Sequence, residues 1–145
     1  MTKKSSPRDT ASYMLLFRNA GPETHAGLSE DERAALAERW NAWYDGLAAA
    51  GKVEHGQPLA LEGRVVSGRR GQRVIDGPYA EAKEVVGGYF MLRVADMEEA
   101  TAIARNCPGL PLGVTVEIRP LAAVSPVLDA VRGRPPKRAP RRASR

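Results

Sequence analysis

Two side chains of this 145-residue chain could act together in proton transfer. Asp76 opens an Asp-Gly-Pro-Tyr stretch, and His55 lies upstream of it between Glu54 and Gly56. A carboxylate within hydrogen-bond distance of an imidazole can orient the imidazole as a general acid or base. An Asp before Gly also commonly accepts backbone N–H groups in a turn, and a histidine on a strand can simply face solvent. Asp76 and His55 are therefore candidate catalytic residues, with turn capping and solvent exposure as the alternatives.

A second set of side chains could bind a ligand. Arg93 and Arg119 are expected on an inward sheet face, where a guanidinium is costly unless it pairs with Glu117 or with an anionic ligand. Both alternatives remain open for these arginines. Tyr79 and Tyr89 could stack on a ligand or donate a hydrogen bond to it, and they could equally pack at an interface. These five residues are the candidate ligand-binding set.

Other residues that often carry chemistry favour structural interpretations here. No Cys and His cluster has metal-ligand spacing, so we predict neither a metal site nor a cofactor. His25, in a loop with Gly and Pro, is expected at the surface. Cys107, the single cysteine, lies on the apolar face of an expected helix and is interpreted as a buried structural thiol. Gly87-Gly88 and the glycines at 68 and 71 do not open a helix after a strand, as a phosphate-binding loop would.

The positive net charge of +5 comes from the C-terminal segment. Residues 132–145 contain seven of the 22 Lys and Arg residues and no acidic residue, which leaves 15 basic residues against 17 acidic ones elsewhere. This segment is rich in Pro, Ala and Arg and cannot form a core, so we predict a disordered tail. Such a tail could bind polyanions weakly, without sequence preference and with a steep salt dependence.

The chain has no sequence feature that predicts a membrane anchor. No apolar run approaches the ~18 residues of a spanning helix, and the N-terminal residues lead into no apolar signal-peptide core. A single cysteine also fits a reducing compartment. The sequence therefore predicts a cytoplasmic protein without a membrane partner.

The elements that must position these residues follow from hydrophobic periodicity. Residues 13–17 and 85–94 have strong strand patterns, and residues 53–61 and 114–119 have weaker ones. A hairpin is expected over residues 64–75. Ser29 followed by Glu32, and Asp96 followed by Glu99, predict helix starts, and an apolar stripe predicts that Trp40 and Trp43 pack against a sheet. Gly51 should end the first helix.

This order predicts one α+β domain with a ferredoxin-like βαββαβ fold and an inserted hairpin. The expected boundaries are a disordered N-terminus over 1–11, the domain over 12–122, a short helix or extension over 123–131, and the tail over 132–145. Two helices can cover only one sheet face, and the other face is too apolar for water. We therefore expect a homodimer in which two sheets pack face to face around a partly enclosed cavity.

Four stretches of the sequence resemble the YCII-related proteins, in the branch named for its Asp-Gly-Pro-Phe signature. They are residues 13–17, 76–84, 87–90 and 116–120, with Tyr79 in place of the signature Phe. The resemblance covers residues 13–121 and implies a ferredoxin-like domain that dimerises through its sheets, like the dimeric α/β-barrel enzymes such as muconolactone isomerases. Some relatives carry a His-Asp pair proposed as an active site. Asp76 matches the aspartate, whereas the histidine position aligns with Gln57, two residues from His55 on the same side of a strand.

Two functions are compatible with the sequence. The first is a homodimer that binds a small organic molecule, which could be anionic, with acid/base chemistry of the isomerase or lyase type. The second is a non-catalytic accessory or regulatory protein, which the resemblance associates with alternative sigma factors. The sequence does not decide whether the chain is an enzyme.

Overall fold

The computed structural model describes residues 10–78 and 84–131. Strands and helices alternate along these residues as β1 (Ala11–Asn19), α1 (Glu30–Ala49), β2 (Val53–Pro58), β3 (Gly63–Ser67), β4 (Arg73–Gly77), β5 (Val85–Val94), α2 (Met97–Ala104), β6 (Thr115–Pro120) and α3 (Pro126–Val131). Two 3-10 helices, η2 (Gly21–His25) and η3 (Leu110–Leu112), precede α1 and β6. Tyr79 and the tail over 132–145 lie outside the described residues.

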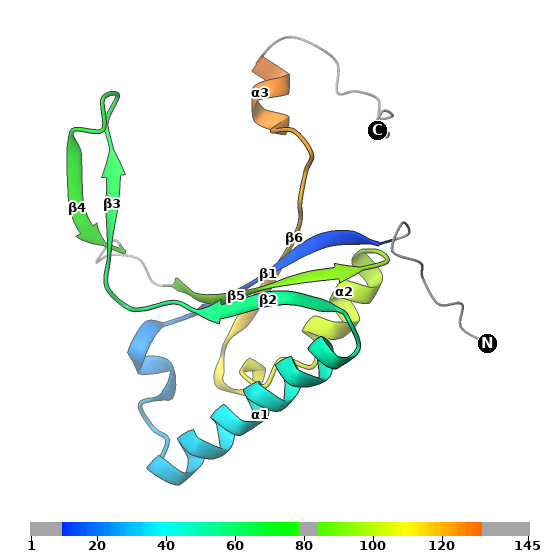
Figure 1. Ribbon diagram of the computed structural model, residues 1–145. Helices are drawn as coiled ribbons and strands as arrows, with labels where there is room; N and C mark the ends of the chain where they lie inside the picture. The colour runs from blue at the N-terminus through cyan, green and yellow to red at the C-terminus, as the bar shows by residue number, and fades with distance from the viewer. Residues whose placement is uncertain (1–9, 79–83, 132–145) are drawn as a thin grey trace.

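Four of the strands form an antiparallel sheet in the order β2-β5-β1-β6. Helices α1 and α2 cover one face of this sheet, and β3 and β4 form a separate two-stranded hairpin (Figure 1). This arrangement is the predicted α+β ferredoxin-like fold with an inserted hairpin. The predicted strand over 53–61 is shorter than expected and ends at Pro58.

Helix α1 begins where the sequence predicted. The Ser29 side chain accepts a hydrogen bond from the Glu32 amide, and the Glu32 carboxylate accepts one from the Ser29 amide, which forms a complete capping box. Gly51, with a φ of +74°, follows the helix. A left-handed residue just after the last turn ends a helix, and glycine adopts this conformation without a Cβ penalty.

The core lies between the two helices and the sheet. Leu15 and Phe17 of β1 and Phe90 and Leu92 of β5 are buried on the helix-covered face. Trp40 of α1 packs edge-on against Phe17, with ring centroids 5.0 Å apart. Phe17 also lies 5.9 Å from Trp43 and 4.9 Å from Phe90. The prediction that both tryptophans pack against the sheet is confirmed.

The face of the sheet opposite the helices is called here the open face. Alternation along the strands places Met14 and Leu16 of β1 and Met91 of β5 on it, and all three are half-buried. Polar and charged side chains surround this apolar strip on the neighbouring strands. In one chain the open face therefore has no layer above it except at its margins.

Two segments rise from the margins of the open face. They are the β3–β4 hairpin and the segment 121–131 that carries α3, and both project away from the helical layer (Figure 1). Ser125 begins α3, and its hydroxyl accepts a hydrogen bond from the Leu128 amide. Among the described residues, no helix is long and apolar enough to cross a membrane.

Candidate functional site

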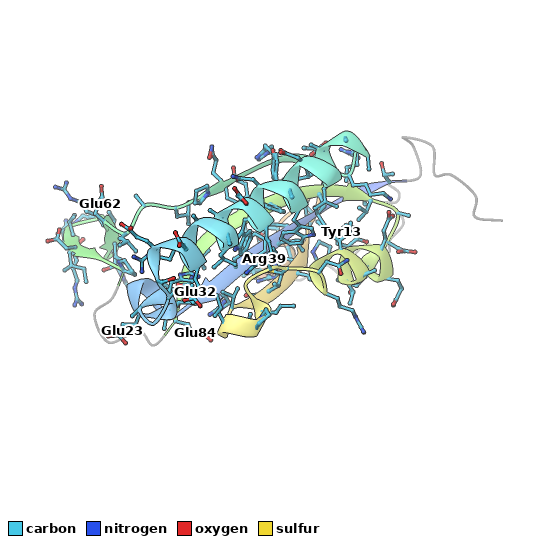
Figure 2. All side chains as sticks on the ribbon, turned by 90° about the horizontal axis from the view of Figure 1, so that it is seen from below. Tyr13, Glu23, Glu32, Arg39, Glu62 and Glu84 are labelled. Carbon is cyan, nitrogen blue, oxygen red and sulfur yellow. The ribbon has the colours of Figure 1, made fainter. Side chains whose placement is uncertain are left out.

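A cavity of about 640 Å³ lies between α1 and one end of the sheet, on the helix-covered face. Its walls come from the ends of β1, β2 and β5, from η2 and from the middle of α1. Figure 2 shows Glu23 of η2 and Glu84, which precedes β5, at the same end of the molecule, with Tyr13 away from that end. The cavity is lined by Phe17, Asn19, His25, Ala37, Trp40, Asn41, Tyr44, Gly56, Gln57, Pro58, Gly87, Gly88, Tyr89, Phe90 and Val114.

Two glycines on the sheet side of the cavity allow close packing between β2 and β5. Gly56 lies opposite Phe90 in the β2–β5 pairing, and Gly88 lies opposite Pro58. A Cβ on Gly56 would come within 2.6 Å of the Phe90 ring and 2.8 Å of the Tyr89 carbonyl oxygen. A Cβ on Gly88 would lie 3.0 Å from the Gln57 carbonyl oxygen. A larger residue at either position would therefore collide with the neighbouring strand at this end of the sheet.

The 3-10 helix η2 closes one side of the cavity and positions His25. The Asn19 side chain accepts a hydrogen bond from the Gly21 amide at 2.7 Å, and the Thr24 hydroxyl accepts one from the Ala20 amide at 2.9 Å. Gly21 has a φ of +79°, a conformation that favours glycine. The chain is thereby turned so that His25, the last residue of η2, faces the cavity.

The imidazole of His25 is the most unusual polar group of the cavity. Its Nε2 atom is buried and has no hydrogen-bond partner among the described residues. His25 was expected at the surface, and the structure places it half-buried, with its Nε2 atom inaccessible to solvent. Buried polar atoms nearly always have a partner, so this one calls for an explanation such as an ordered water, an ion or a functional role.

Five of the seven predicted site residues lie on the open face. The His55 Nδ1 atom and the Tyr89 hydroxyl are 3.0 Å apart and form a hydrogen bond. The Arg93 guanidinium donates to Glu54 at 3.0 Å, and Arg119 donates to Glu117 at 3.3 Å. Of the two interpretations left open for the arginines, the structure shows pairing with carboxylates.

A run of charges crosses the other half of the open face. Arg18 of β1 forms ion pairs with Glu117 at 2.7 Å and with Glu84 at 3.4 Å. Arg119 completes the run through its own pair with Glu117. Cross-strand neighbours such as Leu16 and Glu117 bring these side chains within reach of one another. The open face is therefore a surface of paired charges around an apolar strip.

Asp76 is separated from the other predicted site residues by its place in the hairpin. It lies on β4, opposite Arg64 of β3, and is exposed. His55 belongs to β2 of the main sheet. Neither residue lines the cavity, whereas Tyr89 does. Within one chain the two candidate catalytic residues thus lie in different sheets.

Two titratable groups near the core have shifted pKa values. The Lys52 ammonium, together with the Ala95 amide, holds the pKa of Glu99 below its usual value. Burial raises the pKa of the Cys107 thiol. Cys107 is buried and reduced, as predicted for a structural thiol. Both groups lie away from the cavity lining and stabilise the α2 side of the domain.

The family model for the YCII-related domain matches residues 12–122. This chain belongs to the YCII-related family. The match spans the four-stranded sheet, both covering helices and the hairpin. The Asp-Gly-Pro-Phe branch remains a prediction within that family.

One protein of similar sequence and one solved structure of similar fold can be compared with this YCII-related chain. An uncharacterised protein from Rhizobium meliloti (strain 1021) is 39% identical over 54 residues, which span 37% of this chain and 44% of that protein. A solved structure, 5-chloro-2-hydroxyhydroquinone dehydrochlorinase (TftG) from Burkholderia phenoliruptrix AC1100 in complex with 2,5-dihydroxybenzoquinone, has a TM-score of 0.46 and 12% identity. The structural match covers 77% of this chain and 93% of that one. At this similarity it carries no inference about activity.

The sequence interpretation missed the cavity residues for a physical reason. Asn19 and His25 lie in a loop whose path depends on the Gly21 turn, which gives no periodic signal. The Gly87-Gly88 pair was a visible signal, because adjacent glycines in an apolar strand often mark a close approach or a missing side chain.

Proposed function

We propose that this chain binds a small, flat organic molecule in the cavity between α1 and the sheet. The observation that carries the proposal is the combination of an aromatic cavity with the unpartnered Nε2 of His25. A volume of about 640 Å³ falls within the range of small-molecule sites, which combine apolar walls with a few placed polar groups. Trp40, Tyr44 and Phe90 supply ring surfaces, and His25 supplies a group that can donate or accept a hydrogen bond.

The lining indicates the class of ligand. Ring walls favour a ring-sized ligand, because aromatic pairs gain energy from offset or edge-to-face contacts in addition to burial. The side-chain amides of Asn19 and Asn41 and the imidazole of His25 can each bind a hydroxyl or carboxylate substituent. We therefore propose a ring bearing at least one oxygen substituent, and acid/base chemistry at that substituent with His25 as the proton donor or acceptor.

The binding test uses the intrinsic fluorescence of Trp40, which lines the cavity. Titration with 4-nitrophenol, a ring bearing one hydroxyl, should quench tryptophan emission with saturation. Ala37→Leu, which extends a side chain from α1 into the cavity, should weaken this binding at least about tenfold, because it displaces part of the ligand. Ala34→Leu on the same helix, outside the lining, should leave the titration unchanged.

Equal titration curves for the two alanine variants would contradict the proposed site. Acid/base activity is tested separately, by deuterium incorporation from D₂O into the carbon acids of a panel of cyclic enones and lactones, followed by NMR. If His25 transfers the proton, His25→Ala should abolish exchange while Asp76→Asn and His55→Ala retain it. The reverse pattern would support the His55 and Asp76 pair predicted from the sequence.

We also propose that the protein forms a homodimer through the open face. Support comes from the apolar strip of Met14, Leu16 and Met91. A surface of this kind is usually covered by a partner. In such a dimer, Asp76 of one hairpin would have to approach His55 of the partner subunit for the predicted pair to form. A monomeric mass by light scattering at micromolar concentration would contradict the dimer.

A non-catalytic accessory role is the second candidate. The observation that favours it is the pairing of Arg93 and Arg119 with carboxylates, which leaves the open face suited to assembly. Under this alternative the cavity would bind no ring compound, and Asp76→Asn would leave partner binding intact. The 4-nitrophenol titration therefore separates the two candidates.

A further inference from the structure

The β3–β4 hairpin and the α3 segment share three properties that favour packing against a common partner. Each is an element that is marginal when isolated, each exposes apolar side chains, and both project from the same side of the sheet (Figure 1). An isolated two-stranded hairpin is marginally stable at best in water. A helix of six residues, such as α3, is also too short to be stable without packing.

The exposed apolar side chains lie where a partner could cover them. Val66 and Val74 are cross-strand neighbours in the hairpin and are 62% and 52% exposed. In α3, Val127 is 71% exposed and Leu128 is 59% exposed. These apolar side chains bury little of their surface against their own chain. Each is large enough to contribute to the core of an interface.

The area of the open face indicates that a dimer needs these two segments. Four strands about 4.8 Å apart, with about six paired residues at roughly 3.3 Å each, give a footprint of about 400 Å². A stable interface commonly buries about 800 Å² on each partner. A flat footprint understates the accessible area of a surface of side chains, but a contact of this size is small for a stable interface, and the two projecting segments are the parts of the chain placed to enlarge it.

The topology also determines where the β3–β4 hairpin and the α3 segment lie relative to each other. The hairpin follows the end of β2, where Pro58 pairs with Gly88, and the α3 segment follows the end of β6, where Pro120 pairs with Tyr13. Strands β2 and β6 are the two opposite edges of the sheet. The end of β2 that leads into the hairpin and the end of β6 that leads into α3 lie at opposite ends of the sheet. The two segments therefore rise from diagonally opposite corners. A two-fold axis between stacked sheets that exchanges these corners brings each hairpin onto the partner's α3 segment.

We propose that in the homodimer α3 of one copy packs against the β3–β4 hairpin of the other, so that two identical clamps hold the stacked sheets together. This inference rests on the proposed dimer and adds the contacts that make it stable. It assigns a partner, a second copy of this chain, to Val66, Val74, Val127 and Leu128. It also explains why the hairpin and α3 form ordered elements without a core of their own.

The test mixes two full-length variants that carry different affinity tags, Val74→Cys and Val127→Cys. Under mild oxidation a disulfide between the two tagged chains is expected, because the hairpin and α3 come from different copies. A mixture of Val127→Cys with Met97→Cys is the matched control. Met97 is also partly exposed but lies on α2, in the helical layer on the far side of the sheet. This control should form no mixed disulfide at the same concentration.

Light scattering on the unsubstituted protein separates the two proposals. A dimer that forms no mixed Val74–Val127 disulfide, or that links α3 to α3 instead, overturns the clamp and leaves the sheet-to-sheet dimer standing. A monomer overturns both. As a second measurement, Val127→Asp should raise the dimer Kd at least tenfold, and Met97→Asp should leave it unchanged. Equal effects of the two aspartates would overturn the clamp.

Discussion

Replacing His25 with phenylalanine is expected to stabilise the ligand-free protein. The buried Nε2 of His25 has no hydrogen-bond partner among the described residues, and a buried polar atom without a partner costs about 1–3 kcal/mol. A phenyl ring keeps the size and planarity of the imidazole and removes that atom. Phe17 and Trp40, which also line the cavity, make its surroundings suitable for an apolar ring.

The expected gain is modest because a phenyl ring is slightly larger than an imidazole. Taking the lower end of the range, we expect about 1 kcal/mol, which for a domain of this size raises Tm by roughly 4 °C. The measurement is thermal unfolding followed by circular dichroism, without ligand and at fixed ionic strength. The same variant should bind 4-nitrophenol at least about fivefold more weakly, because about 1 kcal/mol of hydrogen bonding to the ligand is lost.

His55→Phe is the matched control for this prediction. His55 is exposed, and its Nδ1 atom already forms a hydrogen bond with the Tyr89 hydroxyl. Its replacement should change the free energy of unfolding by no more than about 0.5 kcal/mol and leave 4-nitrophenol binding unchanged. If His25→Phe instead lowers Tm, then Nε2 has a favourable partner in the ligand-free protein. That outcome would refute the reasoning that connects the unpartnered atom to a ligand.

Two further predictions concern packing and electrostatics. Gly56→Ala should lower the free energy of unfolding by about 1–3 kcal/mol in urea titrations, because its Cβ would collide with the Phe90 ring. Gly46→Ala, with open space in the last turn of α1, should raise it by about 0.5–1 kcal/mol, and a loss there would contradict the account of α1. The pKa of Glu99 is lower in the folded state than in the unfolded state. Its carboxylate therefore contributes to the free energy of unfolding at pH values above the unfolded-state pKa, and this contribution is lost as pH falls through the folded-state pKa. Glu99→Gln should therefore lower the free energy of unfolding at pH 7 and change it little at an acidic pH below both pKa values. An equal loss of free energy at both pH values would show that the charge of Glu99 is not responsible.

The sequence predicted the parts of the fold that depend on local signals. Ser29 and Glu32 mark the start of α1 because a capping box satisfies backbone groups within one turn of the chain. Leu15 and Leu92 each fall on one apolar face of their strands because a strand alternates its side chains with a period of two, and the structure shows that both are buried. Such signals need no knowledge of distant residues, and they were enough to give the ferredoxin-like order.

The arrangement of the candidate site depends on contacts that local signals do not contain. Asp76 lies on the separate β3–β4 hairpin and not on the main sheet, and no local signal gives the direction in which this hairpin projects. The partners of Arg93 and Arg119 follow from the register between strands far apart in the sequence. The position of His25 depends on a left-handed turn at Gly21. None of these could be read from the spacing of residues.

The two faces of the sheet differ in what they can bind, and this difference favours the cavity as the ligand site. An anionic ligand on the open face would have to displace Glu117 from Arg18 and Arg119, or Glu54 from Arg93, and would lose the free energy of those ion pairs. In the cavity the Nε2 of His25 is unpartnered, so a ligand that binds it breaks no existing hydrogen bond. The same ion pairs are no obstacle to a second copy, whose face carries the same charges already paired. The proposed ligand in the cavity and the proposed partner subunit on the open face are therefore compatible, and each would use the face whose polar groups suit it.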